Sequence, residues 1–218
     1  GRHLVVLAKN KTGYKNLIKL VSKAWTNGFY SHPRTDKHEL ATHREGLIIS
    51  SACLGGEIPR LLLNGNYEEA DRQVQWHDTF GDDYYLELQR HKATKTNANH
   101  QTYELQISIE GKILELAKKH GIKVVATNDS HFVNEEDAEA HDRLICLATN
   151  KYLNDEGRML YSKQEWLKST KEMSTLFEDI PEAIDNTLEV ASKVEEYDID
   201  HAPIMPNFAI PADFGTEE

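Results

Sequence analysis

The stretch "VVATNDSHF", from Val124 to Phe132, ends an apolar run in a cluster of polar residues. Asp129 and His131 stand two residues apart there, and side chains at this spacing leave an extended chain on the same face. A carboxylate oxygen and an imidazole nitrogen are both ligands for divalent cations. Asn and Asp after a strand also form turns and helix caps without binding anything. The stretch therefore predicts either a cation site or a turn.

Further apolar runs carry residues that could join such a site. Cys53 stands directly before the turn "LGG", and a cysteine thiolate binds zinc-like ions, although free cysteine is also often a buried packing residue. In "YYLELQRH", Glu87, Gln89 and His91 share one face, and we expect His91 to lie in an exposed polar loop. His3 stands at the beginning of the first run rather than at its end, and the pattern does not decide whether it reaches the same place.

Four short apolar runs alternate with helical patterns. The expected strands cover 3–8, 47–52, 84–89 and 122–127. Apolar spacing predicts helices over 14–25 and 102–120, a short helix capped by Asp36, and two helices that end by Gly65 and Gly81. The fourth strand is apolar throughout, as strands buried on both faces are, and the alternation indicates parallel strands. We therefore expect an α/β layered or barrel fold with ligands at the carboxyl ends of the strands.

The region after the fourth strand is predicted to be helical. A helix over 134–150 would place Leu144, Leu147 and Ala148 on one buried stripe, and His141 would be a packing residue or would support the ligands. Two capping-box patterns follow at 162–165 and 169–172, so the start of the next helix is left open.

The composition of the chain changes near Tyr197, where a predicted helix gives way to a proline-rich stretch. A last helix is expected to open at Asp179 and Pro181 and to run to about Glu196. Three of the six prolines lie beyond it, which favours an extended connector. We therefore predict one α/β domain over 1–196 and a connector over 197–218.

Composition limits the class of protein. The formal charge of −11 argues against a self-sufficient nucleic-acid binder. No apolar run approaches the length of a membrane span, and the start "GRHLVVLAKN" has no signal-peptide core. The two cysteines, Cys53 and Cys146, do not suggest a disulfide framework, so we expect a cytoplasmic location.

Taken together, the segments resemble the PHP (polymerase and histidinol phosphatase) domain of bacterial replicative DNA polymerase III alpha subunits. The most specific parts are the ATND-x-H-[FY] pattern in "VVATNDSHF" and the C-x-x-G-E turn "CLGGE". The other segments follow in family order over residues 2 to 211: "HLVVLAKNKTGYKNLIKLVSKAW", "GLIISSACLGGEIPRLLLNG", "YYLELQRH", "EDAEAHDRLICLATNK", "NTLEVASKVEE" and "PIMPNFAIP". The last part resembles the passage into the polymerase palm.

The resemblance implies a distorted β/α barrel whose strand ends hold divalent, zinc-like metal ions linked to 3′–5′ exonuclease activity. Asp129 and His131 match the last ligand motif, Cys53 matches a cysteine ligand and His3 a histidine ligand of that family. The family also implies a DNA-directed DNA polymerase whose palm uses Mg²⁺, and as partners DNA, other replicase subunits and a proofreading exonuclease.

One departure from the family pattern concerns the missing start of the domain. The opening H-x-H motif and the further histidine and glutamate that follow it have no counterpart here. We therefore expect the C-terminal portion of the barrel, as a fragment that is inactive on its own and has open sheet edges.

Two alternatives stay open. One is a free-standing PHP phosphoesterase that uses the same metal cluster on a small phosphate ester. The other is a metal-free domain that stabilises the polymerase and docks a separate proofreading exonuclease. If the intact domain of the polymerase subunit is active, its chemistry is metal-assisted phosphodiester hydrolysis, with Asp129 and His131 holding metal rather than acting as bases.

Overall fold

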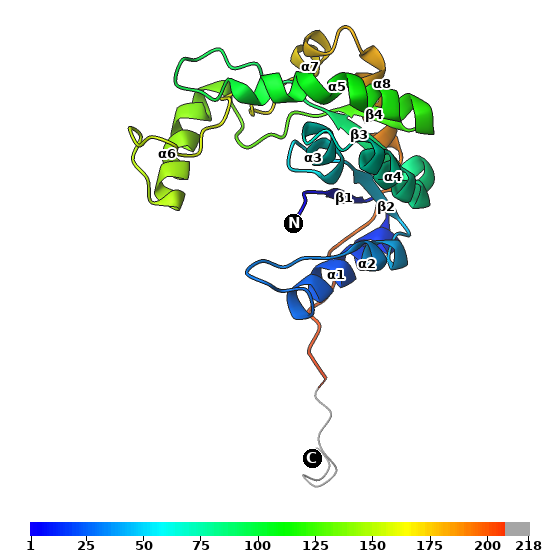
Figure 1. Cartoon of the computed structure of the whole chain (residues 1–218). Helices are drawn as coiled ribbons and strands as arrows, with labels where there is room; N and C mark the ends of the chain where they lie inside the picture. The colour runs from blue at the N-terminus through cyan, green and yellow to red at the C-terminus, as the bar shows by residue number, and fades with distance from the viewer. Residues whose placement is uncertain (208–218) are drawn as a thin grey trace.

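A computed structural model describes residues 1–207 apart from the side chain of Asp78 (Figure 1). Its sheet has the order β1-β2-β3-β4, with β2 parallel to β3 and β3 parallel to β4, whereas β1 runs antiparallel to β2. The strands are β1 (Val5–Ala8), β2 (Leu47–Ser50), β3 (Tyr84–Leu88) and β4 (Lys123–Ala126). All four predicted strands are confirmed within two residues, and so is a mostly parallel α/β fold, as a partial barrel whose sheet is not closed.

The antiparallel β1 corrects the expectation that successive strands run parallel. Helices α1 (Lys11–Thr26) and α2 (Lys37–Thr42) separate β1 from β2. Instead of crossing back to the start of β1, they return the chain to its end, where the N–H of Lys9 donates to the carbonyl of Gly46 at 2.9 Å. Leu47 therefore pairs with Ala8, and β2 leaves in the opposite direction.

Two glycines allow this close return. A Cβ atom added to Gly13 would lie 1.9 Å from the carbonyl oxygen of Gly46, so α1 can pack here only without a side chain. Gly46 has φ +73°, a left-handed conformation that glycine adopts without strain. The side chain of Asn10 caps α1 by accepting from the N–H of Gly13 at 3.0 Å.

One face of the sheet is covered by α3 (Glu57–Leu63), α4 (Tyr67–His77) and α5 (Gln101–His120), with the 3-10 segment η1 (Asp78–Asp83) between α4 and β3. Alternate residues of each strand point into this core, as Leu47, Leu86 and Val124 do. Gly121 ends α5 in a left-handed conformation, as the pattern predicted.

The other face is only partly covered. Helix α8 (Pro181–Ser192) packs on β4, and Val190 contacts a small core of Ile48, Tyr85 and Val125. Tyr85 also donates a hydrogen bond to Glu189 of α8 at 2.8 Å. Beyond this helix the face opens into a cavity that reaches across to β1.

The helices after β4 depart from the sequence prediction in two ways. Chain segment η2 (Glu135–Asp137) leads into α6 (Ala138–Thr149), but Leu144 and Leu147 are 62% and 79% exposed. The predicted buried stripe is wrong because the helix turns Asp142 inward, where Arg158 pairs with it.

The structure resolves the start of one helix, which the pattern left open, and corrects the bounds of the next. Helix α7 (Thr170–Leu176) begins at the second capping box, with Ser169 as its cap. The first capping box caps no helix. Helix α8 begins at Pro181 and ends at Ser192, earlier than predicted, and Asp179 binds Arg90 instead of capping it.

Residues 193–207 contain no helix or strand. The Tyr197 hydroxyl donates to the carbonyl of Ala8 at 3.0 Å, so this segment starts beside β1. The boundary at residue 197 stays a prediction, and residues 208–218 lie outside the described part. Over residues 1–207, no helix is long and apolar enough to cross a membrane.

Candidate metal site at the end of the sheet

The first pair of candidate ligands is His3 and Cys53. Because β1 runs antiparallel, its beginning lies at the same edge as the carboxyl ends of β2, β3 and β4. The His3 N–H donates to the carbonyl of Gly55 at 3.0 Å, and its Nδ1 lies 3.6 Å from the Cys53 sulfur. A Cβ on Gly55 would lie 2.8 Å from that Nδ1, so the glycine turn gives the imidazole room. The position of His3, which the pattern left open, is therefore at this edge.

The second pair is Asp129 and His131, which follow β4. The Asp129 Oδ2 lies 3.7 Å from the His131 Nε2, and both side chains are about a third exposed. The chain is not extended here, since Asp129 has φ +43°. The turn, rather than strand alternation, brings the two side chains together. The turn that the stretch predicted is therefore present, and the cation site stays a prediction.

Hydrogen bonds to a second segment hold this turn in place. The Asn128 side chain donates to the carbonyls of Gln164 and Trp166 at 2.9 and 2.7 Å, and the His131 N–H donates to the carbonyl of Glu165 at 2.8 Å. The His131 ring packs on Tyr161 with a centroid distance of 4.7 Å. No sequence pattern indicates this contact, because 161–168 forms neither helix nor strand.

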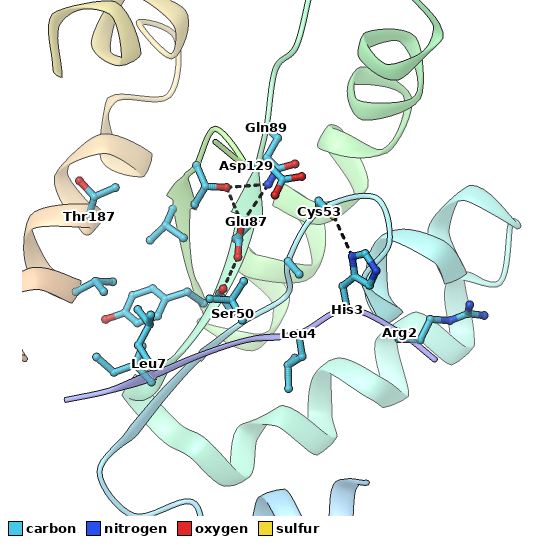
Figure 2. Close-up of a pocket in the computed structure, with 17 residues that line it drawn as sticks. Arg2, His3, Leu4, Leu7, Ser50, Cys53, Glu87, Gln89, Asp129 and Thr187 are labelled. Atoms are coloured by element: carbon cyan, nitrogen blue, oxygen red, sulfur yellow. Dashed lines mark hydrogen bonds between the residues drawn. The ribbon is translucent and has the colours of Figure 1, made fainter. Parts of the chain in front are cut away.

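Cys53 is the member of the first pair that lies nearest to Asp129 of the second. Figure 2 shows Cys53 with Asp129 on one side and His3 on the other. Burial raises the pKa of the Cys53 thiol, and the negative charge of the nearby Asp129 adds to the increase. A nearby cation would oppose both effects, because it favours the thiolate.

These residues line one end of a cavity of about 690 Å³ on the open face of the sheet. Below them, Glu87 accepts hydrogen bonds from the hydroxyls of Ser50 and Thr127 and from the Gln89 side chain, the last at 3.2 Å (Figure 2). The floor beyond is apolar, formed by residues such as Tyr85. The cavity is therefore polar at the mouth and apolar inside.

His91 corrects the expectation of an exposed loop residue. It is 2% exposed, its Nε2 lies 3.0 Å from the carbonyl of Asn128, and its Nδ1 lies 3.0 Å from Gln106. Burial lowers the pKa of the His91 imidazole, although Glu165 lies 3.9 Å away. His91 thus supports the turn before Asp129 and does not share the cavity face of Glu87 and Gln89.

His141 packs beside the site. Its ring contacts His131, Phe132 and Tyr161 at centroid distances of 5.7, 5.1 and 5.0 Å. Burial and the nearby His131 lower the pKa of the His141 imidazole. This arrangement agrees with the packing role expected from its place on the helix.

The donor types suit a zinc-like ion, but the geometry provides them as two pairs. Within residues 1–207, no three His, Cys, Asp or Glu side chains converge closely enough to hold a metal ion. A structural zinc site takes four protein ligands, and a catalytic one takes three. The two pairs would have to move closer together, or other ligands would have to join them, to complete a site.

Comparison with known proteins gives a consistent result. The PHP domain model matches residues 1–91. The chain is 42% identical over 217 residues to a DNA polymerase III subunit alpha from Borreliella burgdorferi and 38% identical over 219 residues to one from Treponema pallidum. These matches cover 98% and 99% of the chain but only 18% of each relative. A subunit alpha from Thermus aquaticus is 36% identical over 87% of the chain and 15% of its own length.

Proposed function

We infer the function from homology, since this chain carries a PHP domain match and is homologous to a segment of bacterial DNA polymerase III alpha subunits. We propose that it acts in DNA replication as part of such a subunit, a DNA-directed DNA polymerase. The 42% identity over almost the whole chain carries this proposal. A free-standing phosphoesterase is less well supported, because the relatives that match are alpha subunits many times longer.

We propose that His3, Cys53, Asp129 and His131 bind divalent metal at the mouth of the cavity. The mixed sulfur, nitrogen and oxygen donors support a zinc-like ion, and their placement in two facing pairs supports a shared role. Ligands from elsewhere in the intact protein complete the set. The polymerase site, which this segment does not supply, uses Mg²⁺.

The chemistry proposed for the intact domain is 3′–5′ exonuclease proofreading. Bound divalent metal supplies an activated water and polarises the phosphodiester. This chain contributes ligands held in position: Asn128 and the Glu165 carbonyl orient the turn that carries Asp129 and His131. Glu87, hydrogen-bonded to Ser50 and Thr127, keeps the mouth polar. With two pairs of ligands only, the 218-residue chain alone is inactive.

The test uses the full-length subunit that contains this segment. Bound metal is measured by mass spectrometry and exonuclease activity on a labelled primer, for the native protein and for Asp129→Ala and His131→Ala. We expect both variants to lose metal and exonuclease activity while keeping polymerase activity. Asp185→Ala and His38→Ala, which alter exposed residues away from the mouth, serve as controls. Unchanged metal content in the first two variants would show that the ligand assignment is wrong.

A second candidate is a metal-free role in which this domain stabilises the polymerase and docks a separate proofreading exonuclease. The separation of the four donors into pairs favours it. The measurement of bound metal distinguishes the metal-binding role from the docking role. The docking role is supported if the native subunit contains no zinc-like metal and keeps all of its polymerase activity in EDTA with excess Mg²⁺.

Partners and location follow from the proposed subunit. They are DNA, the other replicase subunits and a proofreading exonuclease, and the location is the cytoplasm. Co-purification of the full-length subunit with replicase proteins from a cell extract, compared with a variant that lacks residues 1–207, tests the contribution of this segment to assembly.

A further inference from the structure

The net charge of −11 conceals a strong asymmetry along the chain. The first acidic residue is Asp36, and the seven Lys and Arg residues before it give residues 1–35 a formal charge of +7. The remaining residues carry −18, which restores the total of −11. A basic segment in an otherwise acidic protein indicates contact with a polyanion.

Helix α1 turns part of this charge to solvent. Its inner face packs on the sheet through residues such as Leu20, which is buried. Lys15, Ser22 and Trp25 follow one another on the opposite face at helical spacing, and all three are exposed. The helix has no acidic residue at all, and its outer face carries Lys15 and Lys19 beside the exposed apolar residues Ile18 and Val21.

Ion pairs neutralise only some of these charges. Lys9 pairs with Asp83, and Lys23 pairs with Glu39 at 2.8 Å. Among the described side chains, no carboxylate lies within 4.0 Å of Lys15, Lys19 or Arg34. Three cations are therefore available for an external partner.

Exposed aromatic rings lie at the end of the same helix and in the loop after it. Trp25 is 59% and Phe29 53% exposed, and their rings stack with a centroid distance of 5.6 Å and an interplanar angle of 22°. Tyr30 is 74% exposed, with the Arg34 guanidinium 5.5 Å above its ring. Together these residues form what we call the basic aromatic face: Lys15, Lys19, Trp25, Phe29, Tyr30 and Arg34.

We propose that the basic aromatic face binds single-stranded DNA. Lysine and arginine side chains beside exposed rings are the combination that holds a single strand, since the cations contact phosphates and each base can stack on a ring. A duplex would use the cations but leave the rings without a role, because its bases are stacked inside. About 15 Å separates Lys15 from Trp25 along the helix axis, so one strand can contact both ends.

This face is separate from the proposed metal site. It lies on α1 and the loop before α2, below the sheet in Figure 1, whereas the cavity mouth lies at the carboxyl ends of the strands. The proposal therefore stands or fails independently of metal binding, and binding is to be measured in EDTA.

The test measures fluorescence anisotropy of a labelled oligothymidylate with the 218-residue chain. We expect a Kd on the order of 10⁻⁴ to 10⁻⁶ M that weakens as salt rises. The double variant Lys15→Glu, Lys19→Glu should bind about tenfold more weakly and lower the salt slope by about 0.7 per lost phosphate contact. Trp25→Ala should weaken binding by about fivefold or more, through lost stacking.

A matched control reverses two exposed helical lysines elsewhere, Lys118→Glu and Lys171→Glu, and should leave affinity within about twofold. Circular dichroism and thermal melting check that each variant is folded, and Phe29→Ala replaces Trp25→Ala if that variant is not.

Three outcomes would overturn the proposal. The first is that the chain does not bind oligothymidylate. The second is that the control variant loses as much affinity as the Lys15→Glu, Lys19→Glu variant. The third is that polyglutamate displaces the labelled strand as strongly as unlabelled oligothymidylate does, while Trp25→Ala leaves the affinity unchanged. The last outcome would show that the face takes an acidic protein instead.

Discussion

The Cys53 sulfur lies 3.6 Å from Nδ1 of His3, although 50 positions separate the two residues. The contact exists because β1 is antiparallel to β2, so that the chain enters the sheet at the edge where β2 leaves it. A thiol and an imidazole brought together this way form half of the proposed metal site.

Cobalt substitution tests whether the Cys53 sulfur binds metal. We expect the cobalt form of the full-length subunit to show a sulfur-to-metal absorption band, since a coordinating thiolate transfers charge to cobalt. Cys53→Ala should abolish the band. Cys146→Ala, at the buried cysteine on α6, should retain it. A band that survives Cys53→Ala would remove Cys53 from the ligand set.

Gly13→Ala should destabilise the chain, because the new Cβ would lie 1.9 Å from the Gly46 carbonyl oxygen. The cost of such overpacking is about 1–3 kcal/mol in the free energy of unfolding, measured by urea denaturation. Gly111→Ala is the matched control on α5, with nothing within 4 Å of its Cβ. It should stabilise by about 0.5–1 kcal/mol. Equal effects at both positions would contradict the close return of the chain.

Arg90→Lys should also destabilise the chain. The Arg90 guanidinium binds Glu110 and Asp179 at the same time and lies over the Phe177 ring, a geometry that a lysine cannot reproduce. We expect a loss of about 1.5–3 kcal/mol in the free energy of unfolding. Arg72→Lys, in an exposed pair with Glu69, should change it by no more than about 0.5 kcal/mol.

The buried ion pair between Asp142 and Arg158 should make stability depend on pH. Arg158 holds the pKa of the Asp142 carboxyl below its ordinary value of 3.8. The folded state therefore binds a proton less readily than the unfolded state. The ion pair stabilises the folded state fully above about pH 3.8, and its contribution falls as the pH drops below that value. Asp142→Asn should cost about 3 kcal/mol near neutral pH, since it leaves the Arg158 cation without its carboxylate partner, whereas Lys163 keeps its ion pair with Glu139.

The pH dependence of this difference is the decisive measurement. Urea denaturation of the native chain and of Asp142→Asn should give stabilities that converge as the pH falls through the lowered pKa of Asp142. A constant difference over that range would mean that the carboxylate charge is not what stabilises the fold.

Asn128→Asp should loosen the turn that carries Asp129 and His131. The change keeps the shape of the side chain but replaces the amide that donates to two carbonyl oxygens with a carboxylate that repels them. Hydrogen exchange should become faster at the N–H groups of His131 and Leu167, which join the two segments. The N–H groups of α5 should exchange as before and provide the internal control.

The four strands and most helices could be predicted because their signals are local. An apolar run such as Val124 to Ala126 is buried on both faces, and Gly121 ends a helix for reasons within a few residues. The direction of β1 was not predictable in this way, since it depends on where two helices return the chain.

In the candidate site, too, local features could be predicted and features that depend on distant segments could not. The pattern identified Asp129, His131 and Cys53 as residues at strand ends, but not the left-handed turn at Asp129 or the burial of His91. Segment 161–168 holds the turn from 30 or more positions away, and His91 is buried between Asn128 and Gln106 of α5. Leu144 and Leu147 show the complementary error, since apolar spacing cannot say which helix face meets a buried ion pair.

The antiparallel first strand has a practical consequence for protein engineering. Gly1 and Arg2 adjoin the candidate ligand His3, and Arg2 and His3 line the cavity, whereas the last described segment, orange to red in Figure 1, extends below α1. An affinity tag or fluorescent fusion joined to the amino end would compete for space with any molecule that enters the cavity. Assays of ligand binding should therefore leave the amino end untagged.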